Sequence, residues 1–273
     1  MRHLSIAAIA AASMVAFTPV ALADSPPPVF SWTGFYIGVN IGGGWGDRDV
    51  NYTPNDLLAY FLFLYGAEPP PASFRSSGVI GGIQLGYNWQ FNNRWLVGFE
   101  TDFDLSGMKG SASTSGAYVP YYTAPFSAPV EERIKWFGTV RARLGYLPMD
   151  NLLLYATGGF AYGRVERSGS WISSYGFAIS NGNTSVVCRS NLTCFAGSSS
   201  DTASGWTIGG GIEYALWQKW TLKAEYLYVK LNSESVVTES ALVVSPGESP
   251  ASFNANFNRA NFNVVRVGVN YHF

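Results

Sequence analysis

The chain contains the run Trp136-Phe137-Gly138-Thr139-Val140-Arg141-Ala142-Arg143-Leu144-Gly145-Tyr146. From Thr139 onward, apolar or aromatic residues alternate with residues that are polar, charged or glycine. Successive side chains of a β-strand point to opposite faces, so this alternation predicts a strand with one apolar face and one face that carries two arginines. A strand of about 10 residues is long enough to cross a lipid bilayer.

Seven further segments show the same alternation: Phe35–Trp45, Val79–Trp89, Trp95–Phe103, Leu154–Tyr162, Trp206–Tyr214, Trp220–Tyr228 and Val265–Phe273. Three connections are short turns, around residues 92–93, 148–150 and 216–218. The other four are long and rich in Ser, Gly, Pro and Asn. This division predicts an all-β protein: an eight-stranded antiparallel up-and-down transmembrane β-barrel with short periplasmic turns and long extracellular loops. An even number of strands places both termini on the periplasmic side.

The charged residues of these segments all fall on the face opposite the apolar one. A Lys or Arg that faces lipid at mid-membrane costs about 2–4 kcal/mol, and a uniform inward orientation avoids this cost. The set contains four acids and four bases, which are expected to neutralise one another in a narrow lumen. A soluble β-sandwich or lipocalin-like barrel would instead turn the apolar face inward. The predicted lumen charge network consists of Glu100, Asp102, Arg141, Arg143, Glu213, Lys223, Glu225 and Arg266.

Aromatic residues gather where the predicted strands meet the short turns. Such a position is typical of the aromatic girdle at a membrane interface, here the periplasmic one. The girdle is predicted to contain Tyr87, Trp89, Trp95, Tyr146, Tyr214, Trp220 and Phe273.

The N-terminus has the pattern of a secretory signal. Arg2 precedes an apolar run from Leu4 to Val15, and Ala21-Leu22-Ala23 forms a small-residue cleavage site. We therefore expect a cleavable signal peptide at residues 1–23, a short periplasmic segment at residues 24–31 and an outer-membrane β-barrel at residues 32–273. The chain without the signal carries 16 basic and 18 acidic residues, a balance that does not indicate a nucleic-acid partner.

The two cysteines, Cys188 and Cys194, lie close together in the exported part. An oxidising periplasm permits them to form a disulfide across a small loop. A metal site would need more ligands, and no histidine lies nearby.

Catalytic groupings are scarce. After the signal the only histidine is His272, at the periplasmic end of the last segment, so no Ser/His/Asp group can form at the extracellular mouth. Glu100 with Asp102 and Glu213 with Glu225 could serve as paired carboxylates, but the equal number of inward bases favours structural ion pairs. The sequence predicts neither an enzyme nor a cofactor or metal site.

One long connection contains an apolar run, Leu57–Tyr65. Asp56 before it is a good N-cap and Gly66 after it a good terminator, so a short helix is expected. The helix is expected to pack over the barrel mouth. The alternative is an apolar docking patch for a ligand or lipid, formed by Leu57, Tyr60, Phe61, Phe63 and Leu64.

The last nine residues, Val265–Phe273, resemble the C-terminal signal that the outer-membrane assembly machinery recognises, through Val267, Val269, Tyr271 and Phe273. Together with residues 32–38, 136–146 and 155–159, they resemble the outer-membrane immunogenic proteins, a porin-like family of OmpA-type eight-stranded barrels. The resemblance covers the strands and not the loops. It implies an integral protein of the outer membrane of a Gram-negative bacterium that supports envelope integrity, in a family with members proposed to bind haem or host factors.

The function expected from these features is that of a structural, surface-exposed barrel with little or no pore activity, because eight strands leave an interior just wide enough for side chains. One alternative is a small porin for passive solute diffusion. Another is a receptor or adhesin that binds through its loops, for example to haem or a host factor. The expected partners are outer-membrane lipids and lipopolysaccharide, the barrel assembly machinery during biogenesis, and an unknown extracellular ligand.

Overall fold

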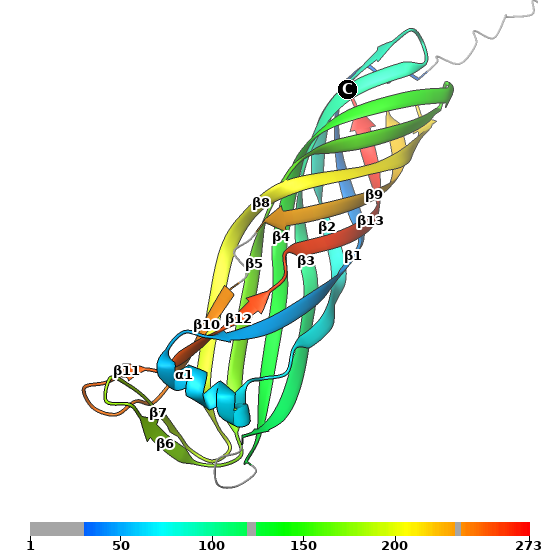
Figure 1. The fold of residues 1–273 in the computed structure, drawn as a ribbon. Helices are drawn as coiled ribbons and strands as arrows, with labels where there is room; N and C mark the ends of the chain where they lie inside the picture. Colours follow the sequence, from blue (N-terminus) through cyan, green and yellow to red (C-terminus); the bar gives the residue numbers. More distant parts are fainter. Residues whose placement is uncertain (1–29, 119–123, 233–235) are drawn as a thin grey trace, which may run out of the picture.

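The computed structural model describes residues 30–118, 124–232 and 236–273 (Figure 1). The predicted signal peptide and most of the predicted periplasmic segment lie outside the described residues. Within the described part, no helix is long and apolar enough to cross a membrane.

Eight long strands form a closed antiparallel ring. Each strand pairs with its neighbours along the chain, and β1 pairs with both β2 and β13, which closes the ring. The eight-stranded up-and-down barrel is therefore confirmed. The ring strands are β1 (Gly34–Pro54), β2 (Ala72–Phe91), β3 (Trp95–Tyr118), β4 (Ala124–Met149), β5 (Leu152–Ser173), β8 (Leu192–Trp217), β9 (Trp220–Asn232) and β13 (Ala260–His272).

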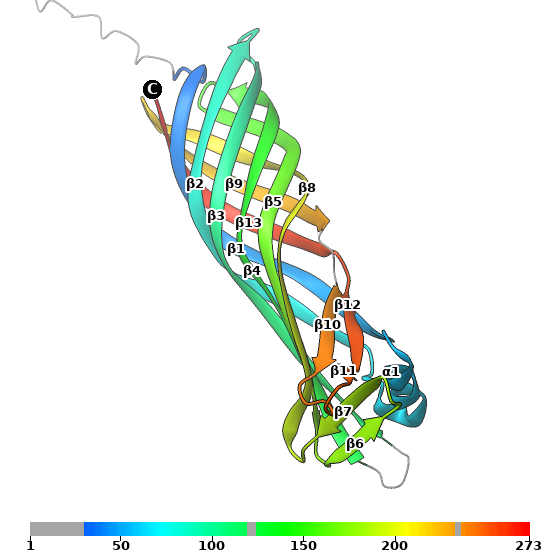
Figure 2. The ribbon, with the colours of Figure 1, turned by 90° about the vertical axis from the view of Figure 1, so that its left-hand side faces the viewer.

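Several strands are about twice as long as the alternating segments suggest. Much of the sequence assigned to long connections continues the barrel wall beyond the predicted spans. Two short strands complete this extension: β12 (Ser252–Phe257) pairs with β1, and β10 (Val236–Ala241) pairs with β12 and β8. The far end carries α1 (Leu57–Leu62), η1 (Phe63–Ala67), β6 (Phe177–Ser180), β7 (Thr184–Cys188) and β11 (Ser249–Pro250) (Figures 1 and 2).

The three short turns lie at the end of the barrel that carries the C-terminus (Figure 1). In the turn between β2 and β3, Asn92 and Asn93 adopt φ values of 49° and 57°. Asparagine tolerates this left-handed conformation better than most residues, because its side chain can hydrogen-bond locally. The two asparagines therefore allow the chain to reverse direction tightly between β2 and β3.

The outer surface of the eight predicted segments is an apolar band. Its side chains are exposed although they are large and hydrophobic, as expected for a surface that faces lipid. Outward-facing members include Phe35, Ile41, Val79, Ile83, Phe99, Val140, Leu144, Phe160, Ile208, Leu222 and Val267. Most of the predicted girdle is likewise exposed beside the periplasmic turns, at Tyr87, Trp89, Trp95, Tyr214, Trp220 and Phe273.

The interior of the barrel is layered. An apolar cluster around Trp32, Leu96 and Leu153 fills the periplasmic end. The charged network lies above it, followed by a second apolar cluster around Phe137 and Phe262. A third apolar cluster fills the extracellular end beneath α1. The buried core of this protein therefore lies inside the barrel and fills its lumen.

Closure of the ring predicts a heat-modifiable electrophoretic mobility. Because a closed barrel leaves no unpaired edge and resists opening, the folded protein should stay compact in detergent at room temperature. We expect unheated and boiled samples to migrate as two different bands on a gel. Identical migration of a sample that circular dichroism shows to be refolded would contradict a closed barrel.

Candidate functional site

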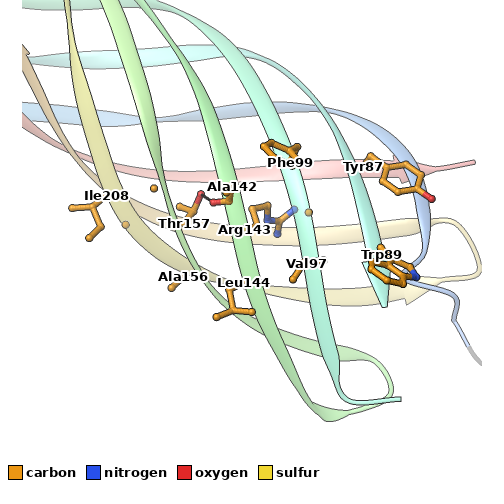
Figure 3. A pocket seen from close by; sticks show the side chains of 13 residues that line it. Tyr87, Trp89, Val97, Phe99, Ala142, Arg143, Leu144, Ala156, Thr157 and Ile208 are labelled. Carbon is orange, nitrogen blue, oxygen red and sulfur yellow. Dashed lines mark hydrogen bonds between the residues drawn. The ribbon is translucent and has the colours of Figure 1, made fainter. Parts of the chain in front are cut away.

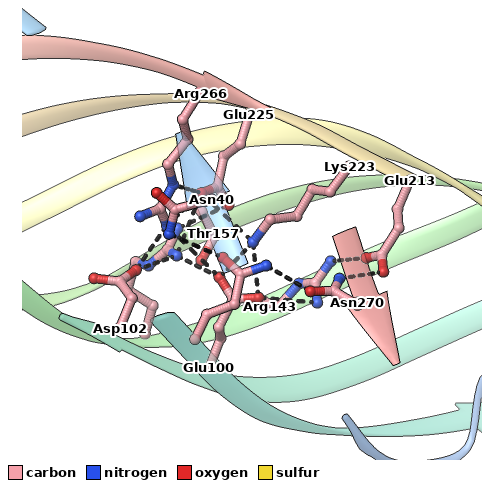
Figure 4. Close-up of polar contacts among 12 residues, drawn as sticks. Asn40, Glu100, Asp102, Arg143, Thr157, Glu213, Lys223, Glu225, Arg266 and Asn270 are labelled. Carbon is pink, nitrogen blue, oxygen red and sulfur yellow. Dashed lines mark hydrogen bonds and ion pairs between the residues drawn. The ribbon is translucent and has the colours of Figure 1, made fainter. Parts of the chain in front are cut away.

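All eight charged side chains predicted for the lumen are buried and belong to one network (Figure 4). Arg141 on β4 lies at its centre. Its Nη2 is 2.5 Å from Oε1 of Glu100 and 2.8 Å from Oδ2 of Asp102, and its Nη1 is 2.9 Å from Oε1 of Glu225. Three strands, β3, β4 and β9, therefore meet across the axis through one guanidinium.

Arg266 on β13 is the second centre. Its Nη2 lies 2.7 Å from Oδ2 of Asp102 and 2.6 Å from Oε2 of Glu225, and its Nη1 lies 2.7 Å from Oδ2 of Asp104. Asp104 was outside the predicted set, because the third alternating segment was taken to end at Phe103. With Asp104 the network has five carboxyl groups facing four Arg and Lys side chains.

The periplasmic half of the network includes tyrosines. The Tyr36 hydroxyl donates to Oε2 of Glu100 at 2.6 Å, and the Arg143 guanidinium lies over the Tyr155 ring at 4.0 Å. Arg143 also pairs with Glu213 at 2.8 Å. Both rings need glycine opposite them: a Cβ at Gly86 would lie 2.3 Å from Cζ of Tyr36. The predicted inward glycines therefore make room for aromatic rings as well as for long basic chains.

Neutral polar side chains complete the network. Gln84 donates to Asn270 at 2.5 Å, and Asn270 donates to Oε1 of Glu213 at 2.6 Å. The Nε2 atom of His272 lies 3.5 Å from the same oxygen, and the His272 ring stacks on Tyr36. His272 is thus part of the structural network at the periplasmic end.

An apolar layer lies directly above the charges. The rings of Phe137 on β4 and Phe262 on β13 are both fully buried, with centroids 5.3 Å apart in an edge-to-face arrangement. They fill the lumen together with Ile80, Met108, Ile134, Ala161, Val165, Ala203, Leu227, Val229, Leu231, Ala260 and Val264. An interior of this kind is close-packed and offers water no polar partner.

A second charged cluster lies above the apolar layer, outside all predicted segments. Arg48 on β1 pairs with Glu132 on β4, whose other oxygen lies 2.9 Å from Nε of Arg167 on β5. All three are buried. Higher still, Glu239 on β10 is buried within the third apolar cluster, and burial raises the pKa of its carboxyl to about 8.

The predicted helix forms the lid of this end. Asp56 caps α1 by accepting from the backbone N–H of Ala59 at 2.9 Å. The helical backbone that continues from α1 into η1 is broken at Gly66, whose φ is 89°. Leu58, Ala59 and Leu62 are buried on the third apolar cluster, as expected for packing over the mouth.

The proposed docking patch is only partly as predicted. Leu57, Tyr60, Phe61 and Leu64 are exposed on the outside of the lid. Phe63 is not, because it packs against Phe253 with ring centroids 5.4 Å apart. Phe63 therefore belongs to the core rather than to an exposed patch.

Cys188 and Cys194 form a disulfide that links β7 to β8, with Cα atoms 5.1 Å apart. Both cysteines are buried in the third apolar cluster. The bond closes a short ring, for which the chain-entropy model gives a stabilisation of about 2 kcal/mol.

The residues of the predicted assembly signal lie on the outward face of β13, with Val267 and Phe273 exposed and Val269 and Tyr271 half-buried. Their role in assembly stays a prediction. The lipid-facing surface also has an apolar hollow of about 720 Å³ that extends from β2 across β3, β4 and β5 to β8 (Figure 3). The hollow exists because small residues lie between larger neighbours, namely Ala142, Ala156 and Gly158. Its shape fits lipid chains.

Comparison with known proteins agrees with this architecture. A family described as outer membrane protein β-barrel domain matches residues 6–273. The chain belongs to this family. This chain is also similar to a protein of Brucella melitensis, the 31 kDa outer-membrane immunogenic protein. The two are 34% identical over 269 residues, which cover 96% of this chain and 92% of the relative.

Other similarities are more distant. The 22 kDa outer membrane protein of Rhizobium leguminosarum bv. viciae is 27% identical over 213 residues, covering 78% of this chain and 71% of the relative. Among solved structures, the attachment invasion locus protein of Yersinia pestis is 14% identical with a TM-score of 0.34, covering 88% of this chain and 99% of that one. The family description and the names of the Brucella and Rhizobium relatives place the β-barrel in the outer membrane, as predicted.

Proposed function

We propose that this protein is a structural, surface-exposed β-barrel of the outer membrane that supports envelope integrity and conducts little or nothing. The observation that carries the proposal is the sequence of layers in the lumen. The Phe137–Phe262 layer lies between two buried charged clusters, and the lid of α1 covers the third apolar cluster. A continuous water path would have to cross each layer in turn.

The alternative of a small porin requires an open lumen. In an eight-stranded barrel, side chains fill the interior unless they are small. Here the inward positions carry large side chains such as Arg141, Phe137 and Arg167, all of them buried. These residues favour a plugged barrel over a diffusion pore.

Single-channel recording tests the proposal directly. Refolded protein in planar bilayers should show no stable conductance steps, whereas a general porin handled in parallel should show them. Deletion of residues 56–66 should change this little, because the Phe137–Phe262 layer and both charged clusters lie below the lid. A large, stable pore in the intact protein or in the deletion variant would favour the porin function.

A receptor function is supported by a separate observation. Leu57, Tyr60, Phe61 and Leu64 expose apolar side chains together on the lid at the extracellular end, and a contiguous exposed apolar patch marks an interaction site. Haem is one candidate ligand, to be tested by haemin titration followed by absorbance. Binding that is unchanged in a Phe61→Ser, Leu64→Ser variant would argue against recognition at this surface.

A further inference from the structure

Four basic side chains gather on the outside of β3, β4 and β5, just beyond the apolar band. Lys109 on β3 is directly opposite Arg133 on β4, and Arg164 on β5 is directly opposite Trp136. Lys135 lies between Arg133 and Trp136 at a bulge in β4. Their side chains point away from the lumen into solvent.

The positive charges of this group exceed the negative charges beside them. Arg133 pairs with Glu131, while Lys135 and Arg164 share Glu166, at 3.2 Å and 3.8 Å. Lys109 makes no ion pair with any residue that the structure describes. Like charges that face each other directly across a β-ladder destabilise it, so the opposition of Lys109 and Arg133 favours an anion between them.

A polar hollow of about 480 Å³ adjoins these cations on the same face. Besides Arg133 and the two glutamates, the hydroxyl-bearing residues Ser168, Ser198 and Ser200 line it. Ser200 accepts a hydrogen bond from Nε of Arg164 at 3.1 Å. Hydroxyls next to guanidinium groups suit a ligand that carries both sugar hydroxyls and phosphate.

The next positions toward the membrane are aromatic. Trp136 packs against Phe103 and Tyr162, with ring centroids 5.5 Å and 6.1 Å away, and Trp206 follows on β8. Aromatic side chains of this kind mark the level of lipid headgroups. The four cations and the hollow therefore stand at the height at which the headgroups of the outer leaflet begin.

We propose that this outer face of β3, β4, β5 and β8 binds the phosphorylated saccharide headgroup of lipopolysaccharide. Lys109, Arg133, Lys135 and Arg164 contact its phosphates, the three serines contact its sugar hydroxyls, and its acyl chains lie along the apolar band below. A phosphorylated glycolipid matches all three features of the face, namely the cations, the hydroxyls and the adjoining apolar wall. Free phosphate would contact only the cations. The site lies on the outer wall, so it does not depend on whether the lumen conducts.

Titration of detergent-solubilised, refolded protein with diphosphorylated lipid A, followed by native mass spectrometry, tests the site. The variant Lys109→Ala, Arg133→Ala, Arg164→Ala should bind this lipid roughly tenfold more weakly, as expected for the loss of several exposed charge-assisted contacts. Lipid A without phosphates should bind the unaltered protein with a similar loss. Heat-modifiable mobility on a gel establishes that each variant is folded.

The matched control is Arg94→Ala, Arg189→Ala, Arg259→Ala, which removes the same charge from exposed positions away from the four cations. It should leave the affinity within twofold. Equal weakening by the two triple variants, or equal binding of the dephosphorylated lipid, would overturn the proposal. Full competition by millimolar inorganic pyrophosphate would also overturn it, because the site would then recognise an anion and not a glycolipid.

Discussion

Replacement of Arg141 by leucine is expected to destabilise the folded barrel by about 3–5 kcal/mol, because it removes one partner of a buried ion-pair network. Arg141 contacts the carboxylates of Glu100, Asp102 and Glu225 within 2.9 Å. After the substitution these three would be left to Lys223, Arg143 and Arg266, in a lumen that already has more carboxyl groups than basic side chains. Leucine fills part of the space but offers the acids no hydrogen bond.

Urea titration of the refolded protein in detergent, followed by gel mobility, measures this change. Val140→Leu is the matched control, since Val140 is the neighbouring residue on the same strand and is exposed on the lipid-facing side. It should shift the unfolding free energy by well under 1 kcal/mol, because lipid accepts either side chain. Equal effects of the two substitutions would mean that the two faces of β4 had been assigned the wrong way round.

The membrane part of the fold could be predicted from the sequence because lipid imposes a single rule. Within the bilayer, apolar residues point outward and charged residues inward, so the parity of Val140 and Arg141 fixes both faces of β4. The same rule predicts the inward orientation of Tyr36 and His272. The short helix that starts as α1 could also be predicted, because Asp56 is a good N-cap and Gly66 breaks the helical backbone beyond α1, within η1.

The extracellular extension could not be predicted in this way, because the rule reverses where the wall leaves the lipid. In β4, Val130 and Ile134 are buried inside, while on the outer side Glu131 is half-buried and Arg133 is exposed. A bulge between Ile134 and Trp136 shifts the pattern by one residue at the boundary. Apart from Glu132, the even-numbered positions of β4 from Phe126 to Tyr146 are therefore apolar or glycine on both sides of the bulge, although they change face. The polar residues and prolines between them before the bulge resemble a loop.

The charged cluster of Arg48, Glu132 and Arg167 was missed for the same reason, since each of its members lies in this extension. Asp104 was missed because it directly follows Phe103, the residue at which the visible alternation of the third segment ends. The layers of the lumen are formed by residues far apart in the chain, such as Phe137 and Phe262. The alternation within each strand predicts the face on which a side chain lies, but it does not predict that the rings of these two residues contact each other.

Glu239 should make the extracellular end less stable as the pH rises. The carboxyl is 1% exposed, lies against the backbone of Gly169, and has no hydrogen-bond partner for either oxygen among the described residues. Its neighbour Tyr52 is neutral and supplies no positive charge that would stabilise an ionised Glu239. The two arginines of the charged cluster below, Arg48 and Arg167, pair with Glu132 instead. Burial in this apolar environment raises the pKa of Glu239 from 4.5 to about 8.

The sign of the effect follows from proton binding. Between about pH 4.5 and 8 the folded protein keeps the Glu239 proton while the unfolded chain has lost it, so unfolding releases a proton and stability falls as the pH rises. At about 1.4 kcal/mol for each pH unit, the loss across this window is on the order of 5 kcal/mol. Above pH 8 the contribution is fully lost, and below pH 4.5 it is fully present.

Glu239→Gln should abolish this loss, because the amide matches the protonated carboxyl in shape and does not ionise. In urea titrations the variant and the unaltered protein should unfold at similar concentrations at pH 5, and the variant should be the more stable by several kcal/mol at pH 9. Glu68→Gln, at an exposed glutamate of the same end, should follow the unaltered protein at both values. If Glu239→Gln were instead equally destabilising at pH 5 and pH 9, the carboxyl would be ionised and partnered throughout, and the carboxylate would stabilise the extracellular end instead of weakening it.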